Sequence, residues 1–403
     1  MKLSDNIAGL EPSATLAVSA AAKALRAEGR EVIDLSAGEP DFRTPDFAAQ
    51  AGIAAIEQGY TQYTPVAGLP ELRAAIARQL ANRSGSPIES KQIVVSVGAK
   101  HALFNVCFTL FGPRDRVLIP SPYWTSYPEI VRLARAEPVL IAATPEDGFK
   151  VSPDLLERHY APNVRGLILN SPNNPTGAVY SRDELAALVD WASRRGVWVI
   201  SDEIYGRVCY TAPRAASVLD LDIDGPAAEH LIVVDGASKA FAMTGWRIGF
   251  SCTSAAVASK ISALQSHTTS NTSTPAQFAA LAAYREDARV DEAVRAMVDV
   301  FTRRRERMLE ALAQHLPDPE FASPDGAFYL FFRVDRHYRD DITDSVKFCM
   351  WLLDHSGVAL VPGAAFGDDR FVRLSFAAAE ADIIEGIRRV GEAVTIGAAE
   401  ASS

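Results

Sequence analysis

The stretch ASKAFAMTGWRIGF, residues 237–250, places a single lysine among small and apolar residues. A lysine in apolar surroundings loses part of its proton affinity and becomes a better amine nucleophile, as Schiff-base chemistry requires. Lys239 is therefore a candidate nucleophile, although a lone lysine with apolar neighbours more often extends its amine to the surface. The nearby Ser238 and Arg247 could bind a phosphate, because a guanidinium offers several donors in a fixed arrangement.

Two carboxylates follow the apolar run in GVWVISDEIY. Asp202 and Glu203 should be buried at the end of a strand, and buried carboxylates need a partner. That partner could be a helix N-terminus or an arginine, or it could be the protonated ring nitrogen of a cofactor. Tyr205 would lie on the same side as Asp202 if a helical turn begins there.

Two further loops follow apolar runs and could hold anionic groups. In SVGAKHALF, a helix begins directly after Gly98, and the free N–H groups of a helix N-terminus form an anion site, most often for phosphate. A glycine at such a turn is weak evidence by itself. NSPNNPTG, residues 170–177, has the composition of a tight turn, and the Asn174 amide could donate to an oxyanion there.

The segments that must position these residues alternate between short apolar runs and helical patterns. The runs are QIVVSVG, RVLIP, RGLILN, GVWVISDEIY and LIVVDGAS. This alternation predicts an α/β fold with a mainly parallel sheet that is covered on both faces. Functional residues in such sheets gather at the carboxyl ends of the strands, so the candidates should meet at one edge.

Residues 285–316 carry an apolar stripe at the spacing of one helix face and predict a long helix. Its RRRER run is interpreted as a solvated face, the usual meaning of such runs. The strand-like pieces GAFYLFFRV, GVALVPG and RFVRLSFA that follow suit a smaller α+β unit.

Composition restricts the class of ligand and the compartment. The 403 residues carry a formal charge of −10, which argues against a nucleic-acid partner, so any anionic ligand must be held by local groups. The four cysteines form no CxxC motif or Cys/His cluster, so we expect neither a metal site nor disulfides. No signal peptide or membrane-spanning run is evident, and we expect a cytoplasmic protein.

Taken together, these motifs resemble those of the fold-type I pyridoxal-phosphate enzymes, specifically the class I aminotransferases and their bacterial aspartate aminotransferase subgroup. The matching blocks, in family order, are EPSATLAV, SAGEPDF, YTPVAGLPELR, VGAKHALF, SPYWTSYPE, NSPNNPTGAVY, SDEIY, SKAFAMTGWRIGF, PDGAFY and VRLSFA. The resemblance implies a large cofactor-binding domain over residues 44–287 and a small domain from residues 1–43 and 288–403. It also implies a homodimer with active sites at the subunit interface.

The resemblance assigns cofactor roles to the matching residues. Lys239 would form a Schiff base with pyridoxal 5′-phosphate and then move a proton at the substrate α-carbon. Asp202 would pair with the ring nitrogen and keep it protonated, and Tyr205 and Asn174 would hydrogen-bond the phenolic oxygen. The residues expected to hold the phosphate or stack on the ring are Gly98, Ala99, Lys100, Ser238, Arg247, Tyr63 of the partner subunit and Trp124.

Substrate roles follow from the same resemblance. Arg373 in FVRLSFA would bind the α-carboxylate as a bidentate pair, and the Gly38 backbone, Trp124 and Asn174 would lie beside the substrate. In this subgroup a lysine at position 100 and a serine at position 13 bind the distal carboxylate of aspartate and glutamate, and this chain has Lys100 and Ser13. Lys100 could instead be a solvated residue of the first helical turn.

The expected reaction is transfer of the amino group of aspartate to 2-oxoglutarate in two half-reactions. Alternatives on the same scaffold are transamination of alanine, aromatic amino acids or prephenate, and β-elimination from sulfur amino acids. Relatives that accept prephenate carry a basic residue where this chain has Glu11, whose charge should disfavour a second carboxylate. A DNA-binding regulator would need a basic module, and a nicotinamide-dependent dehydrogenase would need a GxGxxG motif after the first strand. The chain has neither the charge for the first nor the motif for the second.

Overall fold

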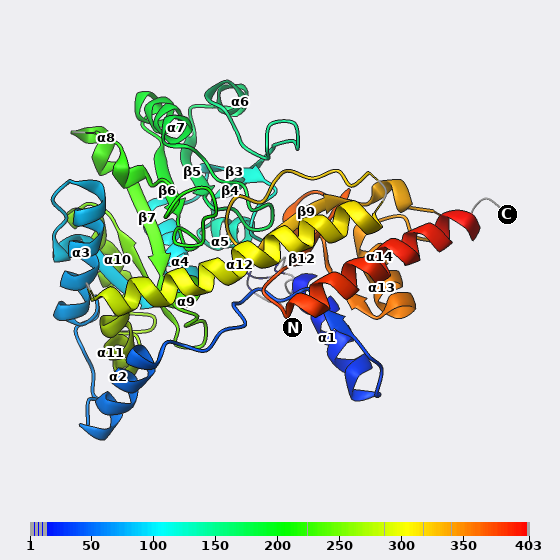
Figure 1. Cartoon of the computed structure of the whole chain (residues 1–403). Coiled ribbons are helices and arrows are strands. Elements are labelled where there is room, and N and C mark those ends of the chain that lie inside the picture. Colours follow the sequence, from blue (N-terminus) through cyan, green and yellow to red (C-terminus); the bar gives the residue numbers. More distant parts are fainter. Residues whose placement is uncertain are drawn as a thin grey trace.

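The larger part of the molecule is built on a seven-stranded sheet, and its mainly parallel arrangement confirms the sequence prediction (Figure 1). The computed structural model describes residues 4, 7, 10, 14–223, 225–285, 287–316, 318–339 and 341–400. The sheet has the order β2-β8-β7-β6-β5-β3-β4, and only β8 runs antiparallel to its neighbours. Its strands are β2 Ile93–Val97, β3 Arg116–Ser121, β4 Glu137–Ala142, β5 Val164–Asn170, β6 Trp198–Asp202, β7 Leu231–Gly236 and β8 Ile248–Cys252.

Two of these strands were not predicted from the sequence. β4 forms one edge of the sheet, contains a proline and is partly exposed, so its apolar signal is weak. β8 is short and overlaps the end of ASKAFAMTGWRIGF, a stretch that we interpret as a reactive site and to which no strand is assigned from the sequence. The other five strands of the sheet coincide with the predicted apolar runs.

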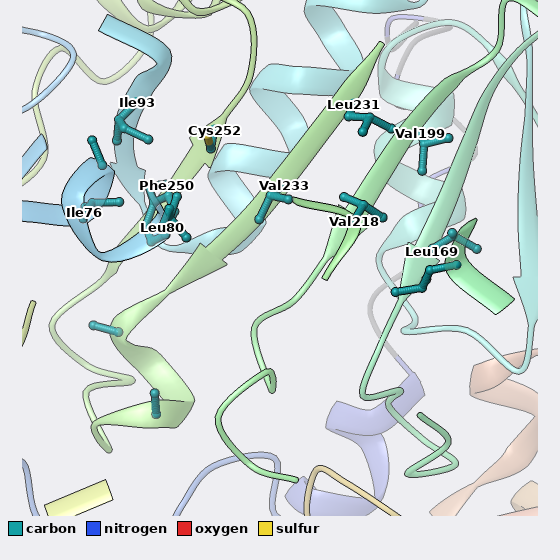
Figure 2. Close-up of a cluster of buried hydrophobic side chains, with 14 of the residues drawn as sticks. Ile76, Leu80, Ile93, Leu169, Val199, Val218, Leu231, Val233, Phe250 and Cys252 are labelled. Atoms are coloured by element: carbon teal, nitrogen blue, oxygen red, sulfur yellow. The ribbon is translucent and has the colours of Figure 1, made fainter. Parts of the chain in front are cut away.

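Helices cover both faces of the sheet and create two cores. Alternate residues of each strand point to opposite faces, so Val199 and Val233 join one cluster while Ile200 and Ile232 join the other. Figure 2 shows the first cluster, in which Ile76 and Leu80 of α3 pack on the sheet. The helices of this part are α2 Asp46–Glu57, α3 Pro70–Ser84, α4 Ala99–Leu110, α5 Tyr127–Leu133, α6 Pro153–His159, α7 Arg182–Arg195, α8 Pro226–Glu229, α9 Ala237–Ala240, α10 Ala255–Ser266 and α11 Thr274–Ala283.

The long predicted helix is present as α12, Ala288–His315. Figure 1 shows it extending from the seven-stranded sheet to the C-terminal unit, where α14, Glu380–Glu400, lies beside it. Val290 and Val294 pack in the first core of the sheet, whereas Phe301 and Met308 belong to a separate core. The helix therefore links two hydrophobic cores. None of the helices in the described part of the chain is long and apolar enough to cross a membrane.

The separate core, which contains Phe301 and Met308, brings together both ends of the chain. It surrounds an antiparallel sheet of order β11-β12-β9, and Val18 and Ile33 pack in it with C-terminal residues. The 43/44 and 287/288 domain boundaries remain predictions. The elements of this part are α1 Ala14–Ala27, β1 Ile33–Asp34, β9 Tyr329–Arg333, α13 Ser345–Ser356, β10 Val358–Ala359, β11 Val361–Pro362 and β12 Phe371–Ser375. Short 3₁₀ helices are η1 Ser90–Gln92, η2 Val218–Asp220, η3 Asp335–His337 and η4 Gly363–Phe366.

The interpretation of RRRER as a solvated face is wrong for two of its arginines. Arg304 is 12% exposed at its side chain and donates to both carboxylate oxygens of Asp41 at 2.7 Å. Arg305 donates to the carbonyl of Pro324 at 2.6 Å, whereas Arg303 is 62% exposed. Consecutive helical residues point about 100° apart, so a basic run cannot present all its members to solvent when neighbouring chain packs on one side.

Candidate active site

A cavity of about 590 Å³ opens at the carboxyl ends of the parallel strands. The sheet topology brings there segments that follow β2, β5, β6 and β7, together with a residue of β12. The sequence-predicted residues in its wall are Gly38, Ala99, Lys100, Trp124, Asn174, Asp202, Tyr205, Ser238, Lys239, Arg247 and Arg373. The structure therefore places side chains distant in sequence around one space.

Two other sequence-predicted residues, Gly98 and Tyr63, do not line this cavity. Gly98 is adjacent in sequence to Ala99 of the wall and lies against the Arg247 guanidinium. Tyr63 is 91% exposed and does not line the cavity of its own chain. Ser13 and Glu11 lie outside the described residues.

Lys239 is half-buried on the short helix α9, directly after β7. Its Nζ donates to the Gly38 carbonyl at 2.6 Å and lies 5.7 Å from the ring centre of Tyr205. Burial is the main cause that lowers the pKa of Lys239 to about 8; the carboxylate of Glu39 opposes this effect and the guanidinium of Arg373 adds to it. About a tenth of the amine is therefore neutral, and nucleophilic, at pH 7, which is far more than for a lysine of ordinary pKa.

Asp202 ends β6 and is only 3% exposed. Its Oδ2 accepts a hydrogen bond from the Tyr127 hydroxyl at 2.7 Å, and its Oδ1 accepts one from the Ile204 amide at 3.2 Å. Burial raises the pKa of Asp202 to about 6, and these two donors limit the rise. The carboxylate is thus ionised above about pH 6 and retains lone pairs that face the cavity.

The adjacent carboxylate has a different environment. Glu203 is outside the cavity wall and pairs with Arg83, whose Nη1 lies 3.2 Å from Oε2. Glu203 therefore has an arginine partner, one of the three possibilities that the sequence left open. Asp202 is the carboxylate left available to a ligand.

One end of the cavity can hold an anion. Gly98, with φ +82°, precedes α4, and no side chain caps that helix N-terminus. A Cβ at Gly98 would lie 2.5 Å from Nη2 of Arg247, so only glycine allows the guanidinium to approach this closely. Arg247 donates to the Thr244 carbonyl at 3.0 Å, and Ser238 lies in the same wall. Free backbone N–H groups, a guanidinium and a hydroxyl together form a phosphate-type site.

Arg373 projects from β12 and is 4% exposed. Its Nη1 donates to Oδ1 of Asn174 at 3.0 Å, and its Nη2 donates to the Ser36 carbonyl at 2.8 Å. Its Nε is buried without a hydrogen-bond partner, which is unusual for a buried polar atom and leaves a donor for a ligand carboxylate. Because the Asn174 carbonyl oxygen faces Arg373, the NH₂ group of that amide is the end that can donate elsewhere.

Comparison with known proteins decides the identity of this arrangement. The pattern of the family "Aminotransferase class I and II" matches residues 30–390. The aspartate aminotransferase of Streptomyces avermitilis is 42% identical over 96% of this chain and 95% of its own. The chain belongs to the class I and II aminotransferases.

Other relatives agree with this membership. The probable aspartate/prephenate aminotransferase of Aquifex aeolicus is 39% identical over 97% of this chain and 98% of its own. The structure of the Thermus thermophilus aspartate aminotransferase with maleate has a TM-score of 0.91 at 38% identity, and the match covers 97% of this chain and 99% of that one. This aminotransferase therefore has the fold of its family and is aspartate transaminase-like.

The cavity of this aminotransferase fits pyridoxal 5′-phosphate, the cofactor of the family. The anion site suits the phosphate, the Lys239 amine suits the aldehyde, and the buried Asp202 carboxylate suits a protonated ring nitrogen. Within the described residues no group of His, Cys, Asp and Glu could hold a metal ion, and the four cysteines are buried and free.

Sequence reasoning overlooked two tyrosines of the aminotransferase site. Tyr127 holds Asp202, and the Tyr329 hydroxyl lies 2.9 Å from that of Tyr205. Burial raises the pKa of Tyr205 well above its ordinary value, so its hydroxyl keeps its proton. Both overlooked tyrosines lie in motifs used for the family resemblance, SPYWTSYPE and PDGAFY, but no role was assigned to them.

We expect the Lys239 amine of the cofactor-free protein to react half-maximally near pH 8, because only the neutral amine is nucleophilic and burial lowers its pKa to about 8. Competitive labelling with acetic anhydride between about pH 6 and pH 11, with the Lys239 peptide quantified by mass spectrometry, measures this midpoint. A model lysine amide, which titrates near about 10.4, is the reference. A midpoint for Lys239 at the reference value would contradict the burial effect.

Proposed function

We propose that the protein transfers the amino group of L-aspartate to 2-oxoglutarate in two half-reactions, with pyridoxal 5′-phosphate as its cofactor. The observation that carries the proposal is one cavity that contains the Lys239 amine, the buried Asp202 carboxylate and the Arg373 guanidinium with its unpartnered Nε. Relatives named aspartate aminotransferase, at about 40% identity over nearly the full length, support aspartate as the donor.

Arg373 would bind the substrate α-carboxylate. Its guanidinium is already oriented by Asn174 and Ser36 and lies 4.3 Å from the centre of the Tyr329 ring. A planar fork that is held in place loses little conformational entropy when a planar carboxylate binds. Gly38 has no side chain to obstruct this end of the cavity.

Lys100 would bind the distal carboxylate of the dicarboxylic substrate. It lies in the first turn of α4 and lines the cavity, and its Nζ is 5.0 Å from the centre of the Trp124 ring. Burial lowers its pKa and Arg247 lowers it further, as expected for a cation that gains from an anionic ligand. The Thermus thermophilus relative was solved with maleate, a dicarboxylate, which supports this assignment. Ser13 would assist it, by the family resemblance.

When bound, pyridoxal 5′-phosphate supplies an aldehyde carbon and an electron-withdrawing ring that stabilises negative charge at the substrate α-carbon. Lys239 would hold and return the α-proton at Nζ, because its neutral form is accessible near neutral pH. Asp202 would keep a proton on the ring nitrogen, and Tyr205 and Asn174 would donate to the phenolic oxygen. Arg247, Ser238 and the N-terminus of α4 would bind the phosphate, and Trp124 would cover the ring.

The same function implies a homodimer, in which Tyr63 of the partner subunit would complete the phosphate site. The segment at α2 exposes several large apolar side chains, as an interface does: Ile53, Ile56, Tyr60 and Tyr63 are 45%, 59%, 48% and 91% exposed. A side chain as exposed as Tyr63 is free to contact another subunit.

A donor panel tests the proposed function. Rapid mixing of the cofactor-loaded protein with single amino acids, followed by the visible absorption of the cofactor, should show the fastest change with aspartate and slower changes with alanine and phenylalanine. Lys239→Ala should lower kcat by up to about 10⁴-fold while the circular dichroism spectrum stays unchanged, because the variant loses its general acid/base. Faster reaction with another donor, release of ammonia and pyruvate from a sulfur amino acid such as cysteine, or an active Lys239→Ala variant would contradict the proposal.

Lys100→Ala should raise the KM for aspartate about tenfold and leave that for alanine nearly unchanged, because only aspartate has a distal charge to lose. Steady-state kinetics with both donors measure the two effects. Lys260→Ala, which removes an amine outside the cavity wall, is the matched control and should change neither KM. Equal increases for aspartate and alanine would remove Lys100 from the specificity account.

In solution we expect a molar mass of twice the chain mass of 43.5 kDa by light scattering. Tyr63→Phe should weaken pyridoxal phosphate binding about tenfold, because it loses a hydrogen bond to a charged group. Tyr60→Phe is the control, since that ring stacks on Phe278 at 4.8 Å and its packing is retained. A monomeric mass, or unchanged cofactor affinity in Tyr63→Phe, would exclude a shared site.

A further inference from the structure

Glu203 follows Asp202 directly but points to the other side of the chain. Successive residues at the end of a strand alternate in direction, so Ser201 and Glu203 share one side and Asp202 faces the cavity. Glu203 is 2% exposed, and no role in the proposed reaction has been given to it. A fully buried carboxylate is costly to retain, so its contacts call for an explanation.

One carboxylate oxygen of Glu203 accepts three hydrogen bonds. Its Oε1 lies 3.0 Å from the hydroxyl of Ser201, 2.7 Å from the hydroxyl of Ser217 and 3.2 Å from the amide of Val218. This number of donors stabilises the ionised form and defines the direction of the side chain. The second oxygen, Oε2, has no hydrogen bond and faces the Arg83 guanidinium at 3.2 Å.

Arg83 connects this carboxylate to a neighbouring helix and loop. It belongs to α3, its side chain is 6% exposed, and its Nε also pairs with Oδ1 of Asp220 at 3.1 Å. Asp220 in turn accepts a hydrogen bond from the Ser217 amide at 2.8 Å. The end of β6 is thereby tied to α3 and η2 on the side away from the cavity.

The anchored segment holds one of the two donors to Asp202. Oδ1 of Asp202 accepts from the Ile204 amide, which belongs to the peptide group that begins with the Glu203 carbonyl. The Glu203 amide donates to the Val234 carbonyl at 2.8 Å, so the backbone on its other side is also held. Any rotation of residue 203 would therefore move the Ile204 donor and, with it, the Asp202 carboxylate.

We propose that Glu203 is a positioning residue, whose buried ion pair with Arg83 holds the backbone at 202–204 so that Asp202 is aligned with the cofactor ring. This inference rests on the proposed role of Asp202. Glu203 does not line the cavity and would act on the cofactor only through the peptide that orients Asp202.

Glu203→Gln tests the proposal because it keeps the size of the side chain and removes its charge, so that an NH₂ group or a neutral oxygen faces Arg83. Titration of the cofactor-free protein with pyridoxal phosphate should show a Kd about tenfold higher than that of the wild type. In the loaded enzyme, kcat with aspartate should fall about tenfold and KM should change less than about twofold, because Arg373 and Lys100 lie on other elements.

Asp220→Asn is the matched control. It neutralises the other carboxylate paired with Arg83 and keeps an oxygen that can accept from the Ser217 amide. Both variants should lower Tm, but only Glu203→Gln should raise the Kd of the cofactor. Equal changes in Kd for the two variants, or a Glu203→Gln variant with wild-type Kd and kcat, would overturn the proposal.

Ser201→Ala provides a milder test if Glu203→Gln does not fold. It removes one of the three donors to Oε1 of Glu203 and should raise the Kd about threefold, since the other two donors and Arg83 remain; an unchanged Kd would count against the proposal. The wild type separates the two levels of inference. If it neither binds pyridoxal phosphate nor reacts with aspartate, the proposed function fails, whereas a functional wild type with normal variants refutes only the role of Glu203.

Discussion

The Asp202 carboxylate must stay charged although it is almost removed from water. The rest of the site is arranged around this constraint. Burial alone disfavours the ionised form, and Tyr127 and the Ile204 amide offset part of that cost. Those donors come from α5 and from the turn after β6, so the position of the carboxylate depends on elements that meet only in the folded chain. A ligand with a positively charged or protonated nitrogen would complete the compensation.

A second constraint is the close approach of main chains at the anion end of the cavity. A Cβ on Gly249 of β8 would lie 2.2 Å from the Ala99 amide nitrogen, so α4 can begin against β8 only where the strand has a glycine. The same contact brings Gly98 under the Arg247 guanidinium. Helix N-terminus and arginine therefore converge because two glycines allow it, and the acidic net charge of the chain does not prevent a local anion site.

The segment between β1 and α2 runs past the site from the core that contains both chain ends to the core of the seven-stranded sheet. Its carbonyl groups at Ser36 and Gly38 accept from Arg373 and Lys239, and Asp41 pairs with Arg304 of the connecting helix. At the far end, Thr44 donates to the Ala242 carbonyl at 3.0 Å. A short loop thus contacts both cations that are central to the proposed chemistry, which couples their positions to the packing of α12.

The sequence by itself determined the alternation of strands and helices, because apolar runs and helical periodicity are local properties, and it indicated where Lys239, Asp202 and Asn174 follow strands. It did not reveal β4, an exposed edge strand, or β8, a short strand with a glycine at a close contact. Nor could it divide the roles of Asp202 and Glu203, since both are acids at the end of the same apolar run. Only the tertiary structure decided that Tyr127 contacts Asp202 while Arg83 pairs with Glu203, because those partners are remote in sequence and their approach depends on how α5 and α3 pack against the sheet.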